Sequence, residues 1–230
     1  MDRFVIYLDI EHPLALLDRR KRNRHMSGVL RKSQILRDLS GCGCMPQSFI
    51  WLDGTHLEDL PLLAIVISGN TTDWEHYKAS QLKQPFEVIR NGVVPILGLC
   101  GGHQLVGKAF GGAVAPMRKL RKGEVDPYPQ YRPGFFKEKG FTEVKVGAGN
   151  PLFKGLRDSV VVSESHYCEI KRVPKTLEVI ASNPDCRVQA VAHRDMPVYG
   201  VQFHPETFDE EHPDGKRILE NFFDLAHSLT

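Results

Sequence analysis

Long hydrophobic runs and an excess of charge of one sign are both missing from this sequence. The longest apolar run, Leu60 to Ile67, has eight residues, whereas a membrane-spanning helix needs about 20. Lysine and arginine number 30 and aspartate and glutamate 28, which leaves a formal net charge of +2. No global field favours nucleic acid or a membrane surface as a partner, so we expect a protein that binds neither.

Cysteine is also sparse. The five cysteines are odd in number and irregularly spaced: Cys42, Cys44, Cys100, Cys168 and Cys186. This pattern predicts free thiols in a reducing compartment. Cys42 and Cys44 form a C-x-C pair without the second pair that zinc sites usually show, so no metal site is expected. The N-terminus, MDRFVIYLDIEHP, does not resemble a signal peptide, and we expect the cytoplasm as the location.

What is present is the composition of an ordinary globular domain, 41% hydrophobic and 25% charged. The first half alternates apolar, β-forming runs with amphipathic stretches. It predicts strands over Arg3–Ile10, Gln47–Leu52, Leu62–Ser68 and Val93–Leu99, and helices over Ser27–Leu39, Asp73–Asn91 and Gly102–Phe110. This alternation indicates an α/β protein with a parallel sheet.

The second half has a different pattern. Short strands are predicted around Glu143–Val146, Val160–Ser163, Leu177–Ala181, Val188–His193 and Val198–Phe203, and an amphipathic helix over Pro213–Leu229. The stretch Gly123–Gly140 contains Pro127, Pro129 and Pro133 and predicts an exposed loop. No linker separates the two halves, so we expect one domain over residues 1–230.

The most informative stretch is ILGLCGGHQLVGKAFGG, residues 96–112. A buried strand runs into glycines around Cys100 and a helix follows, which is the pattern of a nucleophile elbow. The helix N-terminus would stabilise a Cys100 thiolate, and the N–H of Gly101 would be an oxyanion donor. The alternative is a buried cysteine after a core strand.

A second stretch, YGVQFHPE at residues 199–206, ends a strand in His204-Pro205-Glu206. A cysteine nucleophile needs a base to take its proton, and the base needs a group that orients it. His204 and Glu206 supply both. The alternative is a surface histidine in a turn, which the presence of Cys100 makes less favourable.

Together the two stretches resemble the class I, or triad, glutamine amidotransferases. GLCGGHQ matches their GxCxGxQ nucleophile motif, and GVQFHPE matches the motif that supplies their histidine and glutamate, in the same order along the chain. The resemblance implies a flavodoxin-like α/β domain, with an open, mostly parallel sheet flanked by helices. It also implies hydrolysis of the side-chain amide of L-glutamine through a γ-glutamyl thioester. Cys100 would be the nucleophile, His204 the general acid/base and Glu206 its orienting group.

Three further positions take roles from the resemblance alone. Gln104 matches the motif glutamine, which helps to hold the amino-acid end of the substrate. Ser165 and His166, in VVSESHYCE, match a segment whose backbone contacts the substrate carboxylate or ammonium. For His166 the alternative is a local hydrogen bond at a strand end.

One turn departs from the family pattern. Where family members often show SGGP, this chain reads SGNTT at residues 68–72, with Asn70 in place of the second glycine. A backbone N–H survives the change, and asparagine tolerates positive φ better than most residues. We therefore expect the oxyanion hole to involve Gly69, Asn70 and Gly101.

The resemblance further implies that ammonia passes to a separate synthetase partner, since we expect no synthetase domain in this chain. No metal or organic cofactor is expected. One alternative is a stand-alone cysteine hydrolase of γ-glutamyl amides or peptides, and another is a non-enzymatic regulator. Two basic runs, Arg19–Arg24 and Arg118–Lys122, stay outside these hypotheses. We expect the first to be a solvated loop before the first helix, with partner docking near the mouth of the site as the alternative.

Overall fold

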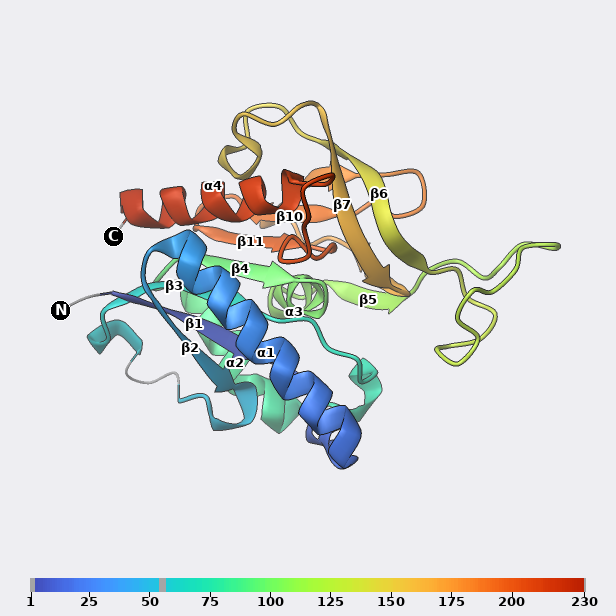
Figure 1. The fold of residues 1–230 in the computed structure, drawn as a ribbon, viewed down its shortest axis with the longest axis horizontal. Helices are drawn as coiled ribbons and strands as arrows, with labels where there is room; N and C mark the ends of the chain where they lie inside the picture. Colours follow the sequence, from blue (N-terminus) through green and yellow to red (C-terminus); the bar gives the residue numbers. More distant parts are fainter. Residues whose placement is uncertain (1–2, 54–56, 230) are drawn as a thin grey trace.

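A parallel half-sheet forms the centre of the protein. The computed structural model describes residues 3–53 and 57–229, and within them the main sheet has nine strands in the order β2-β1-β3-β4-β11-β10-β9-β6-β7 (Figure 1). The first five run parallel to their neighbours. Their bounds are β1 Phe4–Asp9, β2 Gly43–Ser48, β3 Leu62–Ile67, β4 Ile96–Leu99 and β11 Val198–Val201. The predicted parallel sheet is confirmed.

The second half of the chain extends this sheet with antiparallel strands. These are β10 Ala190–His193, β9 Leu177–Ser182, β6 Glu138–Val146 and β7 Ser159–His166. A separate two-stranded sheet pairs β5, Ala113–Pro116, with β8, Cys168–Arg172. The sequence analysis did not predict β5 or β8, because each is short and half-buried, without a clear alternation of apolar residues.

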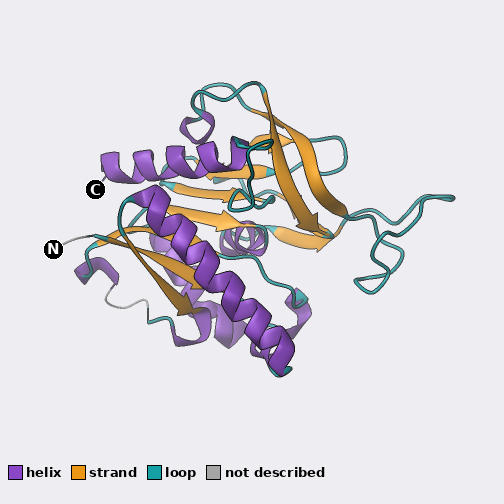
Figure 2. Ribbon diagram, viewed as in Figure 1, coloured by secondary structure: helices purple, strands orange, loops and turns teal. Residues whose placement is uncertain are grey.

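Helices cover both faces of the sheet (Figure 2). They are α1 Arg19–Ser40, α2 Ala79–Asn91, α3 Gly101–Ala109 and α4 Asp214–Leu229. Alternate residues of the strands build two cores: α1 and α4 pack on one face, and α2 and α3 on the other. Short 3-10 helices occupy Pro13–Leu16, Phe49–Trp51, Leu57–Asp59, Trp74–His76 and Pro151–Phe153. No helix in the described residues is long and apolar enough to cross a membrane.

The expected loop at the first basic run is wrong. Residues Arg19–Arg24 form the first turns of α1, which begins eight residues before the predicted Ser27. Asp18 caps this helix, because its Oδ1 accepts the N–H of Lys21 at 2.8 Å. The apolar stripe used for the prediction starts only where α1 reaches the core at Val29, so the solvated N-terminal turns gave no periodic signal.

Two other predicted boundaries are also wrong. The second strand is Gly43–Ser48 rather than Gln47–Leu52, and a 3-10 turn follows it. Pro46 is accommodated because β2 is the edge strand and pairs only with β1. Helix α2 begins at Ala79 instead of Asp73, since a separate 3-10 turn occupies Trp74–His76.

Strands β4 and β11 set the position of the site. They are adjacent and parallel, and Leu99 pairs with Val201 at their carboxyl ends. The residues that follow each strand therefore meet at one edge of the sheet. On the far side of that edge, the chain between β5 and β6 extends away from the body of the molecule as a long loop (Figure 1).

Candidate active site

Cys100 lies in a strained turn between β4 and α3. Its backbone has φ 51° and ψ −104°, a positive φ that is uncommon outside glycine. Such conformations cost about 1–3 kcal/mol and cluster at functional sites. The Cys100 N–H donates to the carbonyl of Val201 at 2.8 Å. The strained elbow is therefore tied directly to the neighbouring strand.

The glycines around Cys100 are required by close packing. A Cβ at Gly98 would lie 2.4 Å from the carbonyl oxygen of Gly102, and a Cβ at Gly102 would lie 2.5 Å from that of Ile67. Both are backbone contacts that cannot move aside. The turn can therefore be this sharp only without side chains at these positions, as the elbow pattern predicted.

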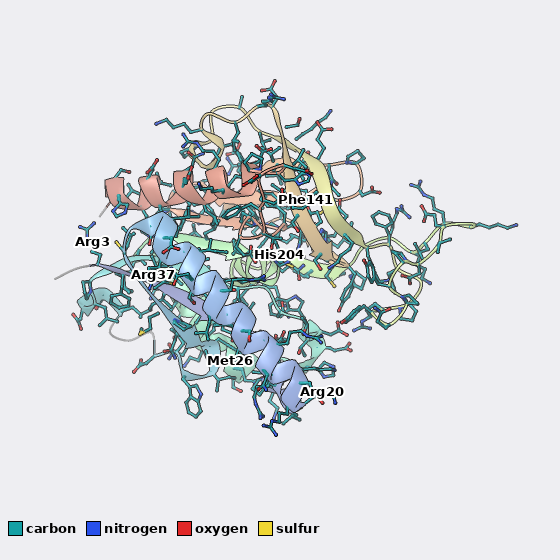
Figure 3. All side chains as sticks on the ribbon, viewed as in Figure 1. Arg3, Arg20, Met26, Arg37, Phe141 and His204 are labelled. Carbon is teal, nitrogen blue, oxygen red and sulfur yellow. The ribbon has the colours of Figure 1, made fainter. Side chains whose placement is uncertain are left out.

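His204 and Glu206 lie beside the thiol, close to the centre of the molecule in Figure 3. The His204 ring hydrogen-bonds the Cys100 side chain. On its other side, the His204 Nδ1 lies 2.9 Å from the Glu206 Oε1. A carboxylate can only accept, so Nδ1–H donates to Glu206 and Nε2 faces the sulfur. The sequence-predicted Cys100, His204 and Glu206 are thus brought together.

The charges of these groups favour an ion pair. Burial alone would raise the pKa of the Cys100 thiol, but the charge and hydrogen bond of His204 hold it below the ordinary value. Burial opposes protonation of His204, yet the charges of Glu206 and Cys100 raise its pKa to about 10. At neutral pH this arrangement favours a thiolate beside an imidazolium, which is the reactive form of a cysteine.

Gln202 is a contact that the sequence analysis did not assign. Its Nε2 donates to the Cys100 Sγ at 3.6 Å, and its Oε1 accepts from Gln104 Nε2 at 3.1 Å. Trp74 Nε1 in turn donates to Gln104 Oε1 at 2.7 Å. Three side chains therefore form a chain of hydrogen bonds that ends on the sulfur. Gln202 stands inside the quoted GVQFHPE, so its position in that motif was the available signal.

Lys32 of α1 completes the other end of the site. Its Nζ lies 2.8 Å from the Glu206 Oε1, which also accepts from His204. Although burial would raise the pKa of Glu206, the charges of Lys32 and His204 hold it well below its ordinary value. Tyr7 of β1 hydrogen-bonds Lys32. A lysine in a basic helix gives no sequence signal for this contact, because it depends on how α1 crosses the sheet.

A cavity of about 420 Å³ opens over the sulfur. Its walls are the turn after β3, the loop before β6 and the β7–β8 connection; among the residues that line it are Asn70, Trp74, Cys100, Gly101, Tyr128 and Lys139. None of the described residues of the two basic runs lines this cavity. Figure 3 shows Arg20 at the far end of α1 from His204. The basic runs therefore do not frame the pocket itself.

The model of the glutamine amidotransferase class-I family matches residues 32–226. The chain belongs to this family. Among its relatives is the glutamine-hydrolysing subunit of GMP synthase from Pyrococcus abyssi, 34% identical over 178 residues, which cover 76% of this chain and 83% of that protein. A protein of the same name from Methanothermobacter thermautotrophicus is 37% identical over 142 residues, 62% of this chain. The chain spans 66% of the length of that relative.

Solved structures of this amidotransferase family share the fold. A GMP synthase subunit from Thermoplasma acidophilum superposes with a TM-score of 0.75 at 25% identity, covering 100% of this chain and 96% of the other. A glutamine amidotransferase from Thermotoga maritima has a TM-score of 0.62 at 18% identity, covering 100% of this chain and 86% of the other. The expected family, fold class and enzyme class are therefore confirmed.

In this amidotransferase the unusual SGNTT turn lies against the elbow. A Cβ at Gly101 would lie 1.8 Å from the Asn70 Oδ1 and 2.9 Å from the Asn70 backbone nitrogen. A Cβ at Gly69 would lie 3.3 Å from the Cys100 Cβ. Gly101 is also the first residue of α3, so its N–H has no partner within the helix. The three residues expected at the oxyanion hole are thus neighbours beside the sulfur.

The expected substrate residues have different surroundings. The amide of Gln104 is fully engaged: its Nε2 also donates to the Cys168 carbonyl at 3.0 Å. The backbone oxygen of Ser165 lies 3.9 Å from the Cys100 Sγ. The Ser165 hydroxyl accepts from Lys139 Nζ at 2.8 Å. His166 lines the cavity but is buried, and its Nδ1 lies 2.9 Å from the Cys168 carbonyl.

His166 also belongs to a buried charged cluster. Its Nε2 lies 2.9 Å from the Glu138 Oε2 and 3.2 Å from the Glu164 Oε2. Burial would lower the pKa of His166, but the hydrogen bonds and charges of the two carboxylates raise it well above the ordinary value. Glu138, His166 and Cys186 have ligand atoms within 4.8 Å of one another. Because His166 is held as a cation between two acids, an ion pair fits this cluster better than a metal ion.

Proposed function

We propose that this chain hydrolyses the side-chain amide of L-glutamine through a γ-glutamyl thioester on Cys100. The observation that carries the proposal is the contact series Cys100–His204–Glu206 at the mouth of a cavity. The thiolate attacks the amide carbon, and the developing oxyanion accepts from the N–H groups of Gly101 and Asn70. The His204 imidazolium gives its proton to the leaving nitrogen, and ammonia departs.

The second half of the reaction uses the same groups in reverse. Neutral His204 takes a proton from water, and the hydroxide attacks the thioester carbon. The carbon–sulfur bond breaks, glutamate leaves, and the thiolate–imidazolium pair is restored. Glu206 keeps the His204 ring oriented through both halves, as an orienting carboxylate does in other triads.

We propose that the ammonia is used by a separate synthetase subunit. The support is the name that the relatives carry, in which glutamine hydrolysis belongs to a distinct subunit of GMP synthase. The fold similarity to the GMP synthase subunit from Thermoplasma acidophilum covers the whole chain. A synthetase that aminates a nucleotide is therefore the first acceptor system to test.

The test is glutamate release from L-glutamine by the purified chain, with Cys100→Ala as the control. Release that depends on Cys100 is the expected result. Addition of a GMP synthase synthetase subunit should then couple ammonia to nucleotide amination. Release that persists in Cys100→Ala would overturn the assignment of the nucleophile.

The cavity favours one second candidate, hydrolysis of larger γ-glutamyl amides or peptides. Its volume of about 420 Å³ falls in the range of pockets for drug-sized ligands, about 300–1,000 Å³. Turnover of γ-glutamyl compounds is therefore measured beside turnover of glutamine. A higher kcat/KM for the larger compounds would favour this candidate over ammonia supply.

A further inference from the structure

A buried carboxylate anchors the turn that lacks the usual second glycine. Glu11, just after β1, is 4% exposed. Its Oε2 accepts the backbone N–H and the hydroxyl of Thr71, at 2.7 and 2.8 Å. Its Oε1 accepts the N–H and the hydroxyl of Thr72, at 3.2 and 2.8 Å. One side chain therefore fixes two successive residues of the turn through both backbone and side-chain donors.

The surroundings of Glu11 favour its charged form in this role. The N–H of His12 also donates to Oε1, at 2.9 Å, which brings the donors to five. A buried carboxylate is tolerated only when its lone pairs are satisfied in this way. Hydrogen bonds to an ionised acceptor are stronger than neutral ones, so the turn has a stiff attachment to the end of β1.

The anchored residues hold Asn70 in place. Asn70 Nδ2 donates to the Thr72 carbonyl at 2.6 Å. On its other side, Asn70 packs so closely on Gly101 that no Cβ would fit there. Asn70 thus lies between the elbow and two threonines that Glu11 fixes. A shift of the threonines would move the Asn70 backbone N–H relative to the sulfur.

We propose that Glu11 is a positioning residue that sets the Asn70 N–H as an oxyanion donor. This inference rests on the proposed function, because it assigns that N–H to the tetrahedral intermediate. In a turn with two glycines the backbone could approach the substrate freely. Here a longer side chain occupies the position, and an external carboxylate holds the turn in its working conformation.

The test compares Glu11→Gln with Glu178→Gln, a change of the same kind on an exposed part of β9. The glutamine side chain offers one acceptor oxygen and turns a donor NH₂ toward the other threonine. We expect kcat for glutamine hydrolysis to fall by about 10²-fold, as for loss of one oxyanion donor, with KM little changed. Glu178→Gln should behave as the wild type.

Two further readouts separate positioning from general damage. Alkylation of Cys100 by iodoacetamide is a direct displacement that forms no oxyanion, so its rate should be unchanged in Glu11→Gln. The aldehyde analogue of glutamine forms a hemithioacetal with an oxyanion, so its affinity should fall in parallel with kcat. Equal losses in alkylation and turnover, or no loss of turnover, would overturn the proposal.

Amide hydrogen exchange at Thr71 and Thr72 reads the anchoring without any substrate. Faster exchange in Glu11→Gln supports it, and unchanged exchange overturns it. If the wild-type chain releases no glutamate, the proposed function fails on that result alone. The exchange rates and the affinity for the aldehyde then still decide whether Glu11 holds the turn and its donor.

Discussion

Removal of the Lys32 amine gives the sharpest test of how the site is held together. Lys32→Met keeps the length of the side chain but deletes the ion pair with Glu206, whose Nζ–Oε1 distance is 2.8 Å. Removing one partner of a buried ion pair costs about 3–5 kcal/mol. The Lys32 side chain is 23% exposed, and Glu206 keeps its contact with His204, so we expect about 3 kcal/mol, the lower end of that range.

The pH dependence of this loss has a defined sign. The pKa of Glu206 is depressed in the folded protein, so its contribution is present above its ordinary pKa of 4.5 and is lost as pH falls below it. The pKa of Lys32 is raised by the charge of Glu206, although burial opposes this. Its contribution is present below its ordinary pKa of 10.5 and is lost at higher pH.

The assay is urea unfolding of wild type, Lys32→Met, Lys32→Arg and Lys83→Met at several pH values. The last variant is the matched control, since Lys83 is exposed on α2. The difference between wild type and Lys32→Met should be constant near neutral pH and shrink in acid, and arginine should restore most of it. An equal loss in Lys83→Met, or a difference that does not depend on pH, would refute the reasoning.

Three other changes act directly at the sulfur. Gln202→Met removes a donor to the thiolate worth about 1.5–3 kcal/mol, so the pH midpoint of Cys100 alkylation should rise by about one unit or more; an unmoved midpoint would contradict the contact. His204→Asn should raise that midpoint as well, because burial of the thiol is then unopposed, whereas wild-type kcat should decline only as pH approaches about 10, where His204 deprotonates. Gly101→Ala should lower kcat by about 10²–10³-fold by displacing Asn70; full activity would show that the clash is relieved without moving the donor.

The sequence predicted those parts of the site that lie within short segments. The elbow around Cys100 and the His204–Glu206 pair are each set by a few consecutive residues, so their patterns could be read directly. Their meeting also followed, because parallel strands bring both segments to one edge. That residues 1–230 form one domain stays a prediction.

The contacts that sequence analysis missed join segments far apart in the chain. Lys32 reaches Glu206 only because of the angle at which α1 crosses the sheet, and Glu11 reaches Thr71 because β1 and β3 are neighbours. Neither residue carries a local pattern that differs from an ordinary surface lysine or loop glutamate. The early start of α1 was missed for a related reason, since its solvated turns bury nothing.

The pairing of β4 with β11 separates the chemistry from the length of the chain between them. Both halves of the catalytic centre depend on one four-residue ladder, from Ile96↔Val198 to Leu99↔Val201. The long loop before β6 leaves and re-enters the fold without entering that ladder. Insertions or deletions in this loop can therefore reshape the cavity wall while leaving the spacing of sulfur and imidazole intact. The fold can thus acquire new acceptors or substrates by changing this loop, without rebuilding its reactive centre.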